Sequence, residues 1–184
     1  MRGITTMTQV NEKAFFATGC FWGAERRFWN MPGVVRTSVG YMGGTKAEPT
    51  YQEVCTGKTG HAEMVEVEYN PSEISYHRLL AEFWTMHDPT SLNRQGGDIG
   101  TQYRSAIYTT TADQLKAALA SREIYNNVLK AHGFDEICTE IKSGEAVAYW
   151  PAEEYHQRYL EKNPKGYDCH SSTGIAYPDQ IFIG

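Results

Sequence analysis

The residues with the clearest chemical potential stand at positions 19–25, which read Gly-Cys-Phe-Trp-Gly-Ala-Glu. They follow the apolar run 14–17, which is typical of a buried strand, and they open a segment in which aromatic residues recur at helical spacing. Cys20 is therefore predicted at a turn from a strand into a helix, where unpaired N–H groups and the helix dipole favour thiolate over thiol. Phe21 and Trp22 add an apolar wall beside the sulfur. The other interpretation is a small hydrophobic cysteine packed in a core turn.

A carboxyl group on the core face of a strand is the second candidate. Residues 61–69 alternate in polarity, and Glu63 shares one face with Val65 and Val67. Because burial disfavours a charged carboxylate, we expect the pKa of Glu63 to rise until the group can donate a proton near neutral pH. The alternative is that Glu63 lies at the wet end of the strand and pairs with a Lys or Arg.

The four cysteines, Cys20, Cys55, Cys138 and Cys169, are widely spread and form no Cys-x-x-Cys pair. This spacing fits neither a disulfide scaffold nor a zinc site, so we expect a reducing cytoplasmic setting with one or two functional thiols. Cys55 and Cys138 are predicted to serve packing. Cys169 falls in the aperiodic segment 163–184, where a mobile tail leaves a thiol exposed.

Together, these groups support a redox sequence. The first sulfur attacks, the carboxyl group protonates a departing oxygen, and the tail sulfur closes a disulfide with the oxidised first sulfur. A cysteine hydrolase that uses Cys20 with His61 or His156 as its base is an alternative. A peptide-binding module without catalysis is a further one.

Composition limits the class of protein. A chain of 184 residues with 41 % hydrophobic and 21 % charged residues fits one globular domain. Its net charge of -5, without a basic run, argues against nucleic acid or an anionic membrane surface as the main partner. No apolar run approaches the ~18 residues that a membrane span needs, and the polar start is not a secretory signal. We expect a disordered leader at 1–12, one catalytic domain at 13–162, a tail at 163–184, and a monomer.

Short predicted strands alternate with helices along the chain. Strands are predicted at 14–17, 34–41, 61–69, 102–108 and 137–142, and helices at 22–30, 75–86, 111–130 and 151–161. A small sheet of short strands favours an α+β fold, which we predict to be a ferredoxin-like two-layer α/β sandwich with a long irregular C-terminal tail.

The heptapeptide at 19–25 resembles the signature of peptide methionine sulfoxide reductases of the A type. The resemblance runs from about Lys13 to His170, and further matching stretches lie at 40–44, 49–51, 60–63, 88–90, 97–105 and 152–157. It implies thiol-dependent reduction of the S epimer of methionine sulfoxide, free or in proteins, which repairs proteins after oxidation.

The resemblance also implies roles for individual residues. Cys20 would attack the sulfoxide sulfur and become a sulfenic acid, while Glu63 protonates the oxygen. Cys169 would then form an intramolecular disulfide with Cys20, and thioredoxin would reduce it. No bound cofactor or metal is implied. Two departures concern the tail: no cysteine follows Cys169, which favours a single disulfide, and Asp168 separates Tyr167 from Cys169.

The implied substrate-binding residues come from three separate stretches. Phe21 and Trp22 would hold the methyl group of the substrate in an apolar pocket. Tyr51 and Tyr103 would assist Glu63 by hydrogen bonding. Asp98 would orient the substrate or a water molecule, although its place between glycines is also typical of a plain turn.

Overall fold

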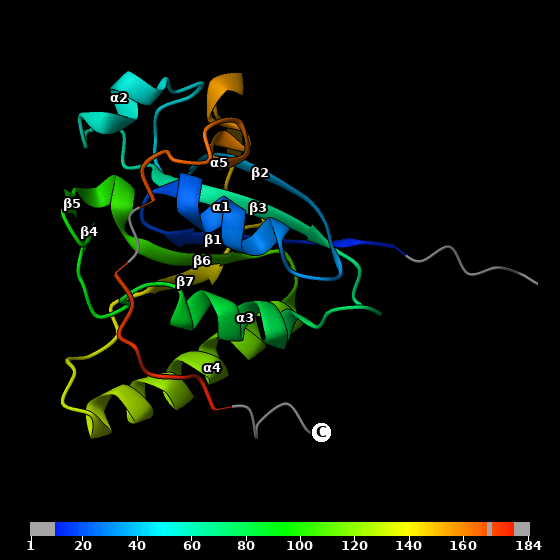
Figure 1. Ribbon diagram of the computed structural model, residues 1–184, viewed down its shortest axis with the longest axis vertical. Helices are drawn as coiled ribbons and strands as arrows, with labels where there is room; N and C mark the ends of the chain where they lie inside the picture. Colours follow the sequence, from blue (N-terminus) through cyan, green and yellow to red (C-terminus); the bar gives the residue numbers. More distant parts are fainter. Residues whose placement is uncertain (1–9, 169–170, 179–184) are drawn as a thin grey trace, which may run out of the picture.

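The computed structural model describes residues 10–168 and 171–178, and its centre is a mixed six-stranded sheet in the order β7-β6-β1-β3-β2-β8 (Figure 1). The strands are β1 (Glu12–Thr18), β2 (Val34–Met42), β3 (Ala62–Tyr69), β6 (Ser105–Thr109), β7 (Glu140–Ser143) and β8 (Tyr149–Pro151). Only β6 and β7 pair in parallel; the other neighbours are antiparallel. A two-stranded ribbon, β4 (Arg94–Gln95) and β5 (Asp98–Ile99), stands apart from this sheet.

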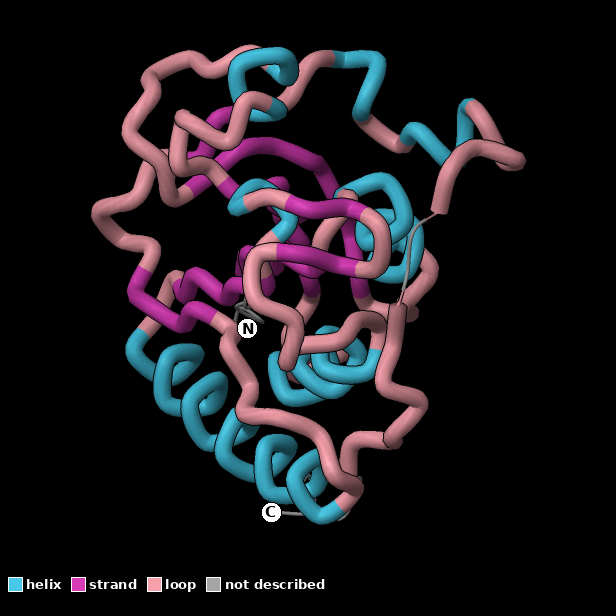
Figure 2. Tube along the Cα trace, turned by 90° about the vertical axis from the view of Figure 1, so that its left-hand side faces the viewer, coloured by secondary structure: helices cyan, strands magenta, loops and turns pink. Residues whose placement is uncertain are grey.

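Helices connect and cover these strands. They are α1 (Phe21–Trp29), α2 (Tyr51–Cys55), α3 (Tyr76–Thr85), α4 (Ala112–Ala131) and α5 (Tyr159–Lys162), with short 3-10 helices η1 (Thr101–Tyr103) and η2 (Glu154–His156). The long α4 helix runs along one edge of the molecule in the view of Figure 2. The α+β class predicted from the sequence is therefore confirmed.

The strand alternation explains how the core forms. Phe16 of β1 points to the face covered by α1 and α3, where its ring lies 5.0 Å from the ring of Phe28 and 5.4 Å from that of Phe83. Its neighbour Phe15 points to the opposite face and joins a smaller apolar cluster, with its ring 5.3 Å from that of Tyr149. Side chains on alternate residues thus supply both faces of the sheet with apolar contacts.

The predicted helix at 151–161 is wrong. Residue 151 ends β8, and only Tyr159–Lys162 is α-helical. Two features stop the helix from forming. Arg158 adopts a left-handed backbone conformation with φ 49°. The side chain of Gln157 pairs with the main chain of β2: its Oε1 accepts the Val39 N–H at 2.9 Å, and its Nε2 donates to the Val39 carbonyl at 2.8 Å.

Two predicted strands also have different bounds. The strand expected at 102–108 begins at Ser105, because Gln102 and Tyr103 belong to η1, in which the Tyr103 N–H donates to the Gly100 carbonyl at 3.0 Å. The strand expected at 137–142 is β7, and it covers residues 140–143. β8, which pairs with β2, was not predicted at all.

The chain ends agree only partly with the sequence expectations. Of the expected leader at 1–12, only residues 10–12 are described, and Glu12 already belongs to β1. Cys169 lies outside the described residues. Residues 171–178 form neither helix nor strand, yet Tyr177 is 5 % exposed and its ring lies 5.7 Å from that of Tyr125 on α4. This part of the tail is irregular, as predicted, and Tyr177 packs against α4.

We predict that Gln157→Ala lowers the free energy of unfolding by about 1–3 kcal/mol, because it leaves the buried N–H of Val39 without its partner, although the Val39 carbonyl still accepts the Ala152 N–H at 2.9 Å. Urea denaturation followed by circular dichroism measures this change. Gln52→Ala on the exposed side of α2 is the matched control. Equal midpoint shifts in the two variants would contradict the prediction.

Candidate active site

Cys20 lies at the turn from β1 into α1, where it is the residue that caps the helix N-terminus. The turn depends on Gly19, which has φ 104°, a conformation that side chains disfavour. A Cβ on Gly19 would also lie 2.8 Å from Cβ and Cγ of Gln95, so the space is closed to any larger residue. Cys20 is 7 % exposed. The structure thus places Cys20 at the predicted strand-to-helix turn.

Glu63 is buried next to the first turn of α1. It is 2 % exposed, and its Oε1 accepts the backbone N–H of Phe21 at 3.1 Å. Because Phe21 follows Cys20 directly, the carboxyl group and the thiol belong to the same helix start. No Lys or Arg forms an ion pair with Glu63 within residues 10–168 and 171–178. The core-face interpretation is confirmed, and the alternative of a solvated ion pair is wrong.

Burial raises the pKa of Glu63 to about 8. The hydrogen bond from Phe21 acts in the opposite direction, whereas the negative charge of Asp98 raises the pKa of Glu63 further. The carboxyl group therefore carries a proton at neutral pH. A neutral carboxylic acid beside a cysteine can donate that proton to a substrate oxygen.

Two tyrosines surround this carboxyl group. Burial raises the pKa of both Tyr51 and Tyr103, and Glu63, once it ionises at higher pH, raises both further. The pKa of Tyr103 also responds to Asp98 and Cys20, which places its hydroxyl among the predicted site residues. Both hydroxyl groups therefore remain protonated and can donate hydrogen bonds. Tyr51 is the first residue of α2, and its N–H donates to the Glu153 carboxylate at 3.0 Å.

Asp98 lies on β5 and faces the tail. Both of its carboxylate oxygens accept hydrogen bonds of 3.2 Å from the hydroxyl group of Tyr167. The glycine-flanked aspartate is thus more than a turn residue, because its side chain connects the β4–β5 ribbon to the segment just before Cys169.

An aromatic cluster gathers around His156, which is fully buried. The indole N–H of Trp22 donates to Nδ1 of His156 at 3.0 Å, and the indole ring stacks on Tyr159 with 3.8 Å between ring centroids. Phe21 is 1 % exposed, with its ring 5.2 Å from His156. Burial lowers the pKa of His156, which keeps Nδ1 available as an acceptor. The sequence suggests His156 only as a possible base and does not predict this orienting contact with Trp22.

Glu25 is a second residue that the sequence analysis did not assign. It is fully buried, and it accepts hydrogen bonds of 2.8 Å from the Thr37 hydroxyl and of 2.8 Å from the Arg158 N–H. Burial raises the pKa of this carboxyl group. Glu25 thereby ties α1 to β2 and to the segment that carries His156. Its place at the end of the heptapeptide was the available signal.

The residues invoked for a hydrolase are occupied elsewhere. Nδ1 of His61 accepts the Gly44 N–H at 3.0 Å, and Nε2 lies 2.7 Å from the Lys46 carbonyl. Nδ1 of His156 accepts the indole N–H of Trp22 and is therefore not available as a base for Cys20. Cys138 is half-buried, and its thiol donates to the Pro89 carbonyl at 3.3 Å. Cys55 is exposed, which contradicts its predicted packing role.

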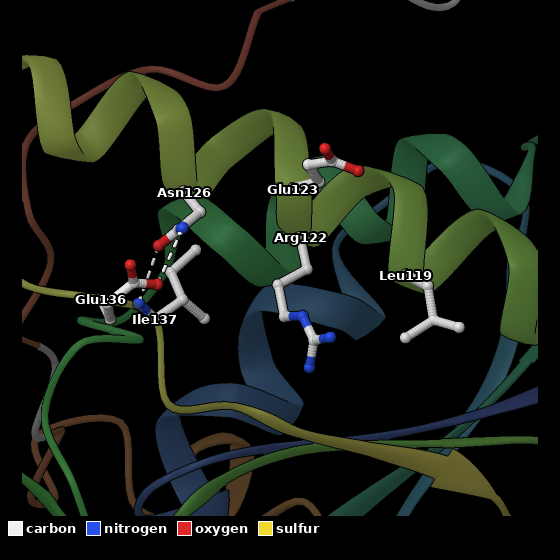
Figure 3. A pocket seen from close by; sticks show the side chains of 6 residues that line it. All are labelled: Leu119, Arg122, Glu123, Asn126, Glu136 and Ile137. Atoms are coloured by element: carbon white, nitrogen blue, oxygen red, sulfur yellow. Dashed lines mark hydrogen bonds between the residues drawn. The ribbon is translucent and has the colours of Figure 1, made fainter.

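The described residues can also be compared with the requirements of a metal site, a membrane-spanning helix and a second pocket. Within the described residues, no group of three or more His, Cys, Asp or Glu side chains could hold a metal ion. None of the helices described there is long and apolar enough to cross a membrane. A surface pocket of about 520 Å³ lies between α4 and the segment before β7 (Figure 3). Its lining, which includes Leu119, Arg122 and Ile137, contains none of the predicted site residues.

The fold and the site define an α+β protein in which a cysteine at a helix start lies beside a buried, protonated carboxyl group. Residues 12–179 match the family model for peptide methionine sulfoxide reductase. The chain belongs to this family, and it is an oxidoreductase that reduces methionine sulfoxide through its thiol chemistry. The hydrolase alternative is not supported.

Individual relatives agree with this assignment. The chain is 56 % identical over 167 residues to peptide methionine sulfoxide reductase MsrA of Rhodospirillum centenum, covering 91 % of this chain and 75 % of the relative. It is 52 % identical over 177 residues to the mitochondrial peptide methionine sulfoxide reductase of Homo sapiens, covering 96 % and 74 %. The solved structure of methionine sulfoxide reductase A of Corynebacterium diphtheriae superposes with a TM-score of 0.83 at 45 % identity, covering 94 % of this chain and 85 % of that one.

We predict that ionisation of Glu63 lowers stability as the pH rises. The folded chain retains this proton up to about pH 8, whereas an unfolded chain releases it near its ordinary pKa of 4.5. The free energy of unfolding therefore falls between these values, by at most about 1.4 kcal/mol per pH unit for one proton. Urea denaturation of Glu63→Gln at a series of pH values should show this slope removed. Glu66→Gln on the opposite face of β3 should retain it, and an unchanged slope in Glu63→Gln would contradict the prediction.

Proposed function

We propose that Cys20 and Glu63 carry out the reduction together, with the S epimer of methionine sulfoxide as substrate. The sulfur of Cys20 attacks the sulfoxide sulfur while Glu63 protonates the sulfoxide oxygen. The attack forms a bond between the two sulfur atoms; the oxygen then transfers from the substrate sulfur to the Cys20 sulfur as the substrate S–O bond and the S–S bond break, so that methionine leaves and Cys20 becomes a sulfenic acid. The observation that carries the proposal is the burial of Glu63 against the Phe21 amide, with a pKa of about 8.

The surrounding residues bind the substrate. Tyr51 and Tyr103 donate hydrogen bonds to the sulfoxide oxygen, which is supported by their protonated state beside Glu63. Trp22, held by His156 and Tyr159, offers its ring to the methyl group. Phe21 supports this platform from the core, and Asp98 orients the bound substrate.

Cys169 resolves the sulfenic acid. Its thiol attacks the sulfur of Cys20, a disulfide forms and water is released; a thioredoxin dithiol then reduces the disulfide. The resemblance of the chain to its family supports this cycle. Among the solved structures of the same fold is Mxr1 from Saccharomyces cerevisiae in complex with Trx2. Oxidised proteins and free methionine sulfoxide are the substrates, and the role is protein repair under oxidative stress in a reducing compartment such as the cytoplasm.

The architecture that we propose is a ferredoxin-like two-layer sandwich, with a catalytic domain at 13–162 and a tail at 163–184. The ferredoxin-like arrangement is supported by the strand order β6-β1-β3-β2, in which all neighbours are antiparallel. The helices α1 and α3, which follow the first and third of these strands in the chain, support the same arrangement.

We expect Glu63→Gln to lower kcat/KM for methionine sulfoxide about 10²–10⁴-fold, because general acid catalysis typically contributes a rate factor of this size. In the parent protein, kcat/KM should fall as the pH rises through about 8, because Glu63 then loses its proton. Initial rates between pH 6 and 9.5, with a thioredoxin system in excess, measure both effects. Glu66→Gln serves as control, and a parent-like rate in Glu63→Gln would exclude Glu63 as the acid.

A second experiment tests the resolving thiol. Cys169→Ser should release about one methionine per enzyme and then stop, leaving a sulfenic acid on Cys20 that dimedone traps. Mass spectrometry identifies the adduct, and amino-acid analysis counts the methionine. Cys138→Ser is the control and should turn over normally. Sustained turnover of Cys169→Ser with thioredoxin would remove Cys169 from the cycle.

A further inference from the structure

The tail segment before Cys169 is anchored to α1 by an ion pair with two arginines. The Asp168 carboxylate contacts the guanidinium group of Arg26, and its Oδ1 lies 3.3 Å from Nη1 of Arg27. We call these three residues the tail clasp. The side chains are partly buried, with exposures of 36 % for Arg26, 32 % for Arg27 and 21 % for Asp168.

The clasp lies close to the start of α1, although both arginines belong to its last turn. Helical side chains lean toward the N-terminus of their helix. Accordingly, Nη1 of Arg27, the atom that contacts Asp168, also donates to the Gly23 carbonyl at 3.2 Å. Gly23 is three residues after Cys20, a rise of about 4.5 Å along a helix. Asp168 is therefore linked, through Arg27, to the first turn of the helix that begins directly after Cys20.

A second contact holds the same segment from the other side. The Tyr167 hydroxyl donates to Asp98, whose charge also influences Glu63. Two consecutive residues thus contact two different elements, Tyr167 the strand β5 and Asp168 the helix α1. Cys169 is the next residue, and consecutive Cα atoms are about 3.8 Å apart.

We propose that Arg26 and Arg27 are positioning residues for the resolving step: by holding Asp168, they bring the thiol of Cys169 to the sulfenic acid of Cys20. The inference rests on the proposed function of Cys169. Anchoring the adjacent residue raises the effective concentration of a tethered thiol. The clasp contributes nothing to cleavage of the S–O bond of the sulfoxide substrate, which precedes resolution.

The reaction that the clasp accelerates is balanced within the chain. The thiol of Cys169 attacks the sulfur of the sulfenic acid, the S–O bond of that acid breaks, and the oxygen leaves as water with the thiol proton and the sulfenic proton. The two cysteines share the new S–S bond. The arginines remain unchanged throughout.

The clasp can be tested by separating the two steps in the full chain. Without reductant, rapid-quench experiments measure methionine release and, in parallel, the rate of disulfide formation from the disappearance of the dimedone-reactive acid. Asp168→Asn and the double variant Arg26→Gln/Arg27→Gln should release methionine at the parent rate. Disulfide formation should be about 3–30-fold slower, because each variant loses a partly buried ion pair that positions the tail. Asp168→Glu should recover part of the rate.

A control variant and a change of ionic strength show whether the effect comes from the ion pair of the clasp. Glu82→Gln, which breaks the Arg78–Glu82 pair on α3, should change neither step. Raising the ionic strength from 0.02 to about 0.5 M should slow disulfide formation in the parent protein and leave Asp168→Asn unaffected. Parent-like disulfide rates in both clasp variants would overturn the inference. If the parent protein itself releases no methionine, or forms no disulfide with Cys169, the proposed function fails instead.

Discussion

The site depends on one unfavourable placement, a carboxyl group buried where no cation neutralises it within the described residues. Glu63 accepts a backbone hydrogen bond from Phe21, and burial keeps its proton in place at neutral pH. An ionised carboxylate there would oppose a thiolate on Cys20, whereas a neutral acid does not. The same burial therefore supplies an acid and protects the nucleophile from a repelling charge.

The rest of the fold holds this arrangement through contacts between distant parts of the chain. Residues 151–158 lie beside β2 and α1 rather than forming a helix, and they deliver two side chains from the same short stretch. Glu153 binds the Tyr41 hydroxyl and the Tyr51 amide, each at 3.0 Å, which fixes the start of α2. His156 receives the indole hydrogen of Trp22. A short stretch that contains only one 3-10 turn thus orients residues on two α-helices.

The sequence was informative where local patterns decide structure. Alternation along 61–69 placed Glu63 on the core face, and glycine with aromatic spacing placed Cys20 at a turn. It failed where partners lie far away in the chain. The pairing of Gln157 with Val39 spans 118 residues, and that of Asp168 with Arg26 spans 142, so no local period could predict either. The exposed thiol of Cys55 was missed for a related reason, since periodicity was unclear in that loop.

The contact between Trp22 and His156 has a consequence for solvent acidity. The imidazole accepts the indole hydrogen only while Nδ1 lacks a proton, and burial shifts the protonation of this ring toward more acidic solution. The stacking surface made by Trp22 and Tyr159 therefore keeps its orientation in mildly acidic surroundings, where a solvated histidine would already be cationic. The orientation of the Trp22 ring is thus coupled to the protonation state of one buried imidazole.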